Sequence, residues 1–333
     1  MPRIGRAVFF GAVALLPALP VAAEPLFGLP LACPPGSICP IQQFVDLDPG
    51  PGARDPWCGT STYDGHKGTD FRVLSLRDVA RGVEVVAMAD GVVKAARDGM
   101  EDRLVSTDED RTSIESRECG NGLILQHGAG LETQYCHMRR GSVRVAPGAR
   151  VRKGEVLGFV GASGMAAFPH VHVTLRRDGK VIDPFTGLAA GQACAGPGAA
   201  AGTGGLMDDA AIAALGDPGL PVLLSAGFAD APVGDKQLVR GLSPKLPDTA
   251  SAALVGYVWA INLARGDRIR ISIDRDGRPF SAQSTDPLDR SKAVYVAYSG
   301  KKGHPQPGRY RMRAEILRDG RAIVAGGAGL DVD

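Results

Sequence analysis

The 333-residue chain lacks a strong excess of charge of either sign. It has 38 lysines and arginines against 36 aspartates and glutamates, a formal net charge of +2. A protein that binds nucleic acid mainly through its phosphates has a clear basic surface, so the composition favours no nucleic-acid partner. Hydrophobic residues make up 44% of the chain. That fraction excludes a chain that is disordered throughout and allows a large buried core.

Beyond residue 23 the chain also lacks any apolar run close to the roughly 20 residues that a membrane helix requires. The first 23 residues have the pattern of a secretory signal. Arg3 and Arg6 precede an apolar run over residues 7–19, and Val21-Ala22-Ala23 has the small residues of a cleavage site. We therefore expect a mature protein that begins near Glu24, has no membrane anchor and is periplasmic or secreted.

Cysteine is sparse, with six residues that all lie in the exported part. One of them, Cys33, is a possible lipoprotein anchor, but Glu24 and Pro30 separate it from the apolar run, which disfavours that alternative. An even number of cysteines in an oxidising compartment favours disulfides over a thiolate metal site. The sequence leaves several connectivities open, and among them we expect Cys33–Cys39, Cys119–Cys136 beside the functional site and Cys58–Cys194 across the ends of one domain.

Histidine is equally rare, yet two of the six histidines stand one residue apart in the run from Phe168 to Val173. In a strand, alternation would place His170 and His172 on the same face. One such pair is weak evidence, because packed or solvated histidines are common. A histidine and an aspartate also occur upstream in Gly65-His66-Lys67-Gly68-Thr69-Asp70, and another histidine ends Tyr135-Cys136-His137.

Catalytic zinc sites usually take three ligands of histidine and carboxylate type and leave a fourth position to water. His66, Asp70 and His172 are the expected ligands of one zinc ion per chain. His137 and His170 then remain as acid-base or electrostatic groups. His127 lies within a predicted hairpin, and we expect it to serve structure.

These motifs, Gly-His-x-Gly-x-Asp, Tyr-x-His and Pro-His-x-His in that order, resemble those of the lysostaphin-type (LytM-type) zinc endopeptidases, which cut peptidoglycan peptides. The resemblance covers roughly residues 56–186. It implies amide hydrolysis by a metal-activated water, with His137 and His170 flanking that water. Of the two we favour His170 as the general base and His137 as the group that stabilises the transition state.

The chain departs from the family pattern at Phe168, where glycine is usual, at Cys136 in place of alanine, and at Val173-Thr174 in place of an aromatic-acid pair. No predicted ligand is lost, but Phe168 borders the expected groove, so the substrate is less certain than the metal chemistry. Three alternatives stay open. They are a zinc-free relative that activates a wall amidase, a zinc endopeptidase acting on other proteins, and a secreted binding or structural protein with incidental histidines.

The predicted fold is mainly β. Residues 56–186 are expected to form an antiparallel lysostaphin-like peptidase sheet, after a Pro- and Gly-rich lead-in over residues 24–55 that has no chemistry of its own. Within this domain residues 98–118 are strongly acidic and lack apolar periodicity, so we expect a surface loop that borders the groove.

The remainder of the chain is expected to form a second domain after a connector. Residues 187–219 are rich in glycine and alanine, with a short helix expected from Asp208 to Leu215. Residues 220–333 alternate apolar and polar side chains, for example over 268–273 and 310–316, which favours an immunoglobulin-like β-sandwich. We expect this accessory domain to position the enzyme or bind a protein partner, while peptidoglycan is the expected substrate.

Overall fold

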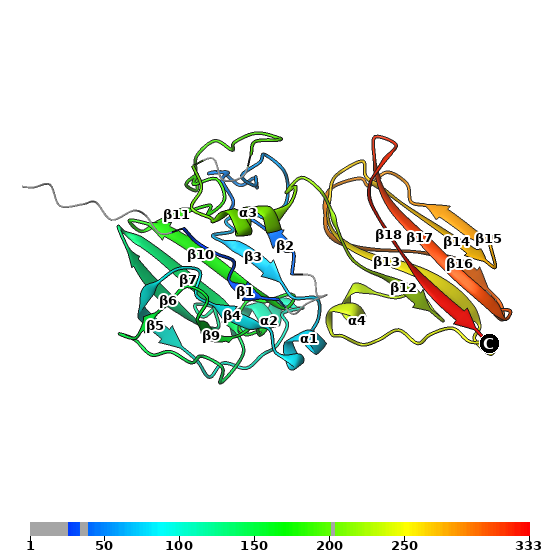
Figure 1. Cartoon of the computed structure of the whole chain (residues 1–333), viewed down its shortest axis with the longest axis horizontal. Coiled ribbons are helices and arrows are strands. Elements are labelled where there is room, and N and C mark those ends of the chain that lie inside the picture. The colour runs from blue at the N-terminus through cyan, green and yellow to red at the C-terminus, as the bar shows by residue number, and fades with distance from the viewer. Residues whose placement is uncertain (1–25, 34–38, 201–203) are drawn as a thin grey trace, which may run out of the picture.

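The computed structural model describes residues 26–33, 39–200 and 204–333. The signal segment predicted for residues 1–23 lies outside the described residues. Two β-rich lobes lie side by side in Figure 1: an N-terminal lobe of residues 26–219 and a C-terminal lobe of residues 220–333. Among the described residues, no helix has the length and apolar character needed to cross a membrane. The prediction of a mainly β, antiparallel protein is confirmed.

The N-terminal lobe is built around an eight-stranded antiparallel sheet. Its strands follow the order β2-β3-β10-β7-β6-β5-β8, with β11 paired to β10. They are β2 (Ile41–Gln43), β3 (Thr69–Arg72), β10 (His170–Arg177), β7 (Leu131–Met138), β6 (Asn121–Gly128), β5 (Gly91–Arg97), β8 (Arg150–Val151) and β11 (Lys180–Ile182).

A smaller antiparallel sheet packs beside the large one. It consists of β1 (Leu31–Ala32), β4 (Glu84–Val86) and β9 (Val156–Phe159). One hydrophobic core joins the two sheets, because Val85 and Leu157 of the small sheet cluster with Tyr135 and Val171 of the large one. The Tyr135 hydroxyl accepts a hydrogen bond from the Met88 amide at 2.9 Å, so the one polar atom of this buried ring is satisfied.

Part of the lead-in belongs to the large sheet. Strand β2 pairs with β3, which carries Asp70, and so it covers the edge of the strand nearest the predicted metal site. Residues 41–43 lie between two Pro- and Gly-rich stretches and contain neither residue, so they are free to donate to a strand ladder.

Three short helices accompany the sheets of the N-terminal lobe. Helix α1 spans Leu76–Arg81. Helix α2 (Asp108–Ser113) lies within the acidic stretch predicted as a loop, where the Thr107 hydroxyl accepts from the Asp110 amide and completes a capping box. The predicted short helix is confirmed as α3 (Asp209–Leu215), whose first turn is capped by the Asp208 carboxylate.

All three predicted disulfides are present. Cys33–Cys39 closes a short loop, Cys58–Cys194 links segments 136 residues apart, and Cys119–Cys136 joins the end of the acidic stretch to β7. No free cysteine remains among the described residues. The sequence therefore predicted both the number and the pairing of the cross-links.

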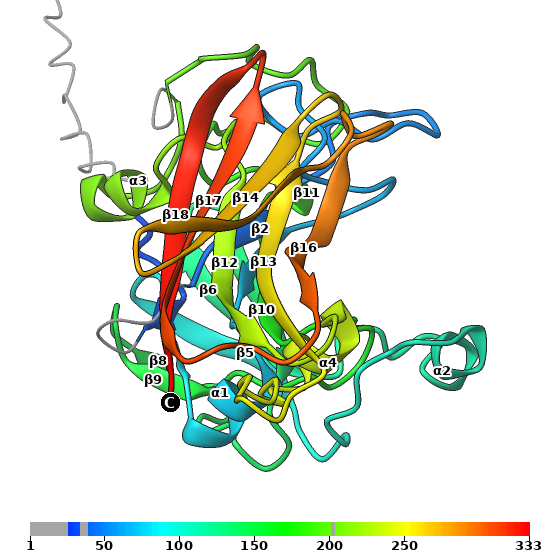
Figure 2. The ribbon, with the colours of Figure 1, turned by 90° about the vertical axis from the view of Figure 1, so that its right-hand side faces the viewer.

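The C-terminal lobe is a sandwich of two antiparallel sheets. One contains β12 (Val222–Ala229), β13 (Ala253–Leu263) and β16 (Lys292–Lys302), and the other has the order β15-β14-β17-β18. The second sheet comprises β14 (Arg268–Arg275), β15 (Arg278–Ser284), β17 (Gly308–Arg318) and β18 (Arg321–Val332). Figure 2 views this lobe from its outer side, with β18 and β16 toward opposite edges.

The alternation predicted from residues 268–273 is confirmed, because Ile269, Ile271 and Ile273 are buried in the core between the two sheets. The immunoglobulin-like part of the prediction is not confirmed. In a constant-type immunoglobulin domain the fourth strand pairs with the fifth, whereas here β15 pairs with β14, the third.

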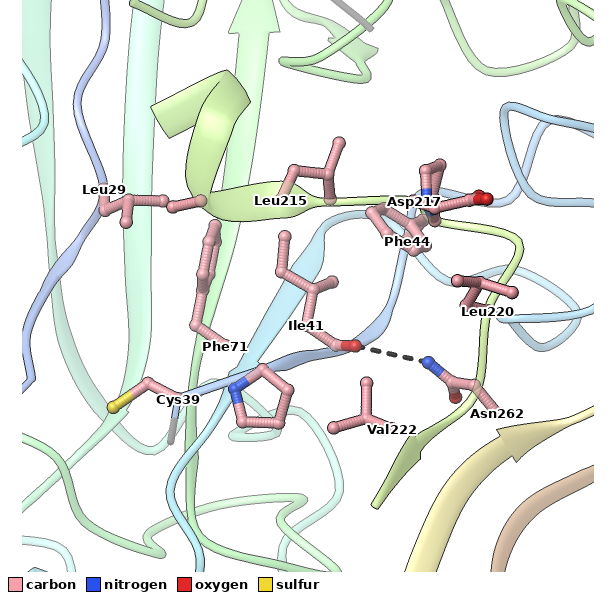
Figure 3. Close-up of a pocket in the computed structure, with 13 residues that line it drawn as sticks. Leu29, Cys39, Ile41, Phe44, Phe71, Leu215, Asp217, Leu220, Val222 and Asn262 are labelled. Atoms are coloured by element: carbon pink, nitrogen blue, oxygen red, sulfur yellow. Dashed lines mark hydrogen bonds between the residues drawn. The ribbon is translucent and has the colours of Figure 1, made fainter. Parts of the chain in front are cut away.

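The two lobes touch directly. The Asn262 amide donates to the Ile41 carbonyl at 3.2 Å, and the Arg77 guanidinium donates to the Ser243 hydroxyl at 2.8 Å. Beside the first of these bonds lies a mainly apolar cavity of about 310 Å³ between the lead-in, α3 and β12 (Figure 3), where Ile41, Phe71 and Leu215 line its walls. A short helix, α4 (Asp235–Val239), also lies on the side of the C-terminal lobe that faces the large sheet.

Candidate metal centre

Strands β3 and β10 bring the predicted carboxylate and one predicted histidine together. Asp70 and His172 are direct cross-strand partners, and so are Arg72 and His170. Because side chains two residues apart share a face of a strand, all four side chains lie on the same face of the sheet. The register therefore places the two histidines of β10 beside Asp70, as the His-x-His spacing predicted.

His66 lies on the turn that leads into β3 and points its ring at the same place. Its Nε2 lies 3.2 Å from Asp70 Oδ1 and 3.1 Å from His172 Nδ1, and His172 Nδ1 lies 2.8 Å from the same carboxylate oxygen. Gly68 permits this approach, because a Cβ there would lie 2.6 Å from His172 Nε2 and 2.5 Å from the Val173 carbonyl.

The second nitrogen of each of these imidazoles is held by a protein oxygen. His66 Nδ1 donates to the Phe44 carbonyl at 2.6 Å, and His172 Nε2 donates to the Thr174 hydroxyl at 3.1 Å. The Phe44 carbonyl can only accept, so it fixes the tautomer of His66 and leaves a lone pair on Nε2. The Thr174 hydroxyl is compatible with the matching tautomer of His172, in which the Nδ1 lone pair faces Asp70. Three potential ligand atoms thus converge within 4.8 Å of one another, a donor set that suits zinc.

His137 and His170 lie beside this triad without belonging to it. Their ring centroids are 4.6 Å apart, and His170 Nε2 lies 3.5 Å from Asp70 Oδ1. His137 Nδ1 donates to the Ser163 carbonyl and His170 Nδ1 to the Phe168 carbonyl, both at 2.8 Å. Each imidazole therefore keeps an unprotonated Nε2 that can accept a proton.

His137 has an unusual backbone conformation. Its φ of +62° is left-handed, which costs about 1–3 kcal/mol for a residue with a Cβ and persists only where the surroundings enforce it. The His137 amide donates to the Cys119 carbonyl at 2.8 Å, and Cys119 is joined by its disulfide to Cys136. The cross-linked segment thus holds the ring of His137 over the site.

The electrostatics of the site favour neutral imidazoles at His137, His170 and His172 beside an ionised Asp70. Burial alone would raise the pKa of Asp70, but His66, His170 and His172 hold it well below its usual range. Burial lowers the pKa of His137, His170 and His172. For His66 burial is the largest single effect and lowers the pKa, but the charge and hydrogen bond of Asp70, the Phe44 carbonyl and the Asp46 charge together raise the pKa above its usual value. A bound cation would neutralise the charge of Asp70.

The groove around these side chains contains residues that the sequence motifs did not indicate. Tyr63 is 52% exposed, and its ring centroid lies 4.6 Å from that of His66. Arg72 lies two residues after Asp70 on β3, and this spacing alone would have predicted that its side chain shares a face of the strand with Asp70. The cavity has a volume of about 410 Å³ and also includes three residues of the C-terminal lobe, Asp235, Ala293 and Val294.

His127 is held away from this groove, as expected. Its Nδ1 donates to the Asp90 carbonyl at 2.8 Å, and its Nε2 lies 2.7 Å from the Thr133 hydroxyl. Both nitrogens are thus bonded outside the groove, one to the residue before β5 and the other to β7. The five residues predicted for the site converge, and the histidine predicted to be structural does not.

Residues 64–184 match the protein family described as Peptidase family M23. This match, to about a third of the chain, confirms the lysostaphin-type resemblance of the motifs. The match covers the segment that contains all five predicted site residues.

Three curated relatives each align with a little over a third of the chain. An uncharacterized metalloprotease of Haemophilus influenzae is 28% identical over 121 residues, 36% of this chain and 20% of the relative. The DD-carboxypeptidase/endopeptidase Mpg of Neisseria meningitidis is 30% identical over 127 residues, 38% of this chain and 23% of the relative. The peptidoglycan DD-endopeptidase ShyA of Vibrio cholerae is 27% identical over 118 residues, 35% of this chain and 22% of the relative. The alignments span about a fifth of the relatives' lengths.

Proposed function

We propose that this chain is an exported, zinc-dependent endopeptidase that hydrolyses peptide cross-links of peptidoglycan. The observation that carries the proposal is the convergence of His66, Asp70 and His172, with His137 and His170 alongside. Two relatives named as DD-endopeptidases support the substrate class. The apolar run and small-residue site in the first 23 residues support export to the periplasm or beyond.

In this proposal the ligand set is His66 Nε2, Asp70 Oδ1 and His172 Nδ1. A zinc ion held there would polarise the scissile carbonyl and lower the pKa of a coordinated water to about 7. The carbonyl of Phe44 and the hydroxyl of Thr174 keep both ligand imidazoles in the required tautomer and orientation.

The two remaining histidines handle the proton and the developing charge. His170 Nε2 faces Asp70 and accepts the proton of the attacking water, because burial keeps this imidazole neutral. His137, fixed by the Ser163 carbonyl, lies on the neighbouring side and stabilises the transition state when its Nε2 carries a proton and can donate to the developing negative charge. The scissile bond we propose is the D-alanyl-diaminopimelate cross-link, as the relatives' DD specificity suggests.

Purified sacculi test the proposal directly. The mature protein with one equivalent of zinc should convert cross-linked muropeptide dimers to monomers, and a chelator or His172→Ala should abolish the conversion. His304→Ala is the matched control, because His304 is exposed and outside the groove. Zinc binding without any cleavage of wall or protein peptides would show that the site is silent, and absence of zinc binding would remove the catalytic assignment.

We expect the Cys119–Cys136 disulfide to contribute to catalysis as well as to folding stability. Replacing both residues with serine removes a cross-link spanning 17 residues and should cost about 3 kcal/mol of folding stability. It also frees the segment that orients His137, so kcat should fall by about 10-fold to 100-fold.

The matched control is the double serine variant of Cys58 and Cys194, which spans 136 residues and lies outside the groove. Thermal unfolding should show at least as large a loss of stability, while kcat of the folded fraction stays near that of wild type. Equal losses of kcat in the two variants would contradict a specific role for Cys119–Cys136.

A further inference from the structure

The catalytic groove is bounded by both lobes. Besides the histidines it is lined by Asp235 at the start of α4 and by Ala293 and Val294 at the start of β16. Strand β16 is an edge of its sheet and pairs only with β13. The first residues of this edge strand therefore line the same cavity as the metal centre.

A buried arginine lies where the two lobes meet. The Arg72 guanidinium carbon lies 4.8 Å from the ring centroid of Phe168 and 4.8 Å from that of Trp259 on β13. Its Nη1 donates to the Gln42 side chain, while Nε and Nη2 are buried without a protein acceptor. A charged group with so few polar partners depends on the two aromatic faces for stabilisation, which favours keeping the lobes together.

The same contacts lead to the catalytic histidines. The Phe168 ring stacks on the His170 ring with centroids 4.5 Å apart and an interplanar angle of 29°. On the other side, the Trp259 indole donates to the Asp235 carboxylate at 2.8 Å. A continuous stack thus runs from His170 through Phe168 and Arg72 to Trp259. Phe168 is the position at which the chain departs from the family pattern.

Apolar packing fixes the wall further. Leu74, Leu104 and Phe168 of the N-terminal lobe pack against a cluster in the C-terminal lobe that contains Trp259, Ile261 and Leu238, with Val294 and Val296 at its margin. Ala293 is exposed at the groove, whereas Val294 is half-buried. The part of the groove wall formed by Ala293 and Val294 is therefore small and apolar, and the cluster around Trp259 supports it.

We propose that the C-terminal lobe forms one wall of the substrate groove and that Ala293 and Val294 limit the size of the peptide residue bound beside His170. The Arg72 side chain, clamped between Phe168 and Trp259, is the positioning residue that holds this wall. The inference rests on the proposed function and refines its substrate. A residue as small and uncharged as alanine fits beside such a wall, and bulky side chains are excluded.

The test uses the full zinc-loaded chain and two hydroxamate probes. Acetohydroxamate contacts only the metal, whereas a peptidyl hydroxamate ending in D-alanine also occupies the groove. In Ala293→Trp, affinity for the peptidyl probe should fall by about tenfold or more while affinity for acetohydroxamate changes less than about twofold. The control is Ala282→Trp on the edge strand β15, because Ala282 is also exposed but lies outside the groove.

A second variant tests the wall from the opposite direction. Val294→Ala should bind a peptidyl hydroxamate ending in phenylalanine several-fold more tightly than wild type does, since it removes two methyl groups from the wall. The Val294→Ala variant tests the proposal even if Ala293→Trp does not fold. The inference is overturned if both probes respond alike in Ala293→Trp, or if Val294→Ala leaves the preference for alanine unchanged.

Failure of the proposed function has a different signature. If the wild-type chain discriminates between the probes as expected but leaves sacculi intact, peptidoglycan is not its substrate, whereas the role of the C-terminal lobe in the groove is supported. Cleavage of sacculi by the wild type, with unchanged probe affinities in both variants, would support the endopeptidase function and contradict the proposal that Ala293 and Val294 line the substrate groove. If the chain binds no zinc, both the proposed function and this inference are contradicted.

Discussion

Replacement of Asp70 with asparagine is expected to reduce the zinc content well below one equivalent and to lower peptide-bond hydrolysis by at least about 10³-fold, or about 4 kcal/mol of transition-state stabilisation. Asp70 is 3% exposed, and its Oδ1 is the atom toward which His66 and His172 converge. An amide of the same shape has no negative charge to offset a divalent cation.

Metal analysis of the purified variant and release of muropeptides would be measured together. Asp64→Asn is the matched control, because Asp64 is an exposed aspartate on the same turn as His66. The control should keep both zinc and activity. If Asp70→Asn retained a full equivalent of zinc with normal turnover, Asp70 would not be a ligand and the assignment of the metal centre would fail.

Replacement of His137 or His170 with alanine is expected to separate catalysis from metal binding. Each variant should keep one zinc, because neither imidazole belongs to the converging triad. The kcat of each should fall by about 10²-fold to 10⁴-fold, the usual contribution of a positioned acid-base group. KM should change less, since the loss is felt mainly in the transition state.

The pH profile distinguishes these residues further. Burial lowers the pKa of both His137 and His170, so both imidazoles stay neutral at pH 7 and become protonated only below the usual range of histidine. Activity of the wild type should therefore persist into mildly acidic solution and fall below that range. Loss of zinc from either alanine variant would instead identify the missing histidine as a ligand.

Much of the site could be predicted because its information is local. His66 and Asp70 are four residues apart on one turn and strand, and His170 and His172 share a strand face through the two-residue period. The disulfides could be proposed because so few cysteines were present in an exported chain. The helix from Asp208 was predictable for the same reason, since its cap and its first turn are adjacent in sequence.

Other features arise from pairings between distant segments, which the local sequence does not encode. The lead-in strand β2 supports β3 through its ladder, and the carbonyl that follows it orients His66. The left-handed backbone of His137 depends on a bond from its amide to Cys119. The pairing of β15 with β14 in the C-terminal lobe was likewise not predicted, because alternation predicts strands but not their neighbours.

The sequence by itself determined which side chains can bind a metal, which cysteines can pair and that most of the chain forms strands, since spacing, composition and two-residue periodicity express these properties directly. Only the tertiary structure decided that Trp259 and Val294, far along the chain, meet Arg72 and Phe168 at the groove. The physical reason is that the packing of two lobes depends on the complementary shapes of their whole surfaces, and these shapes cannot be inferred from any single residue or short sequence pattern.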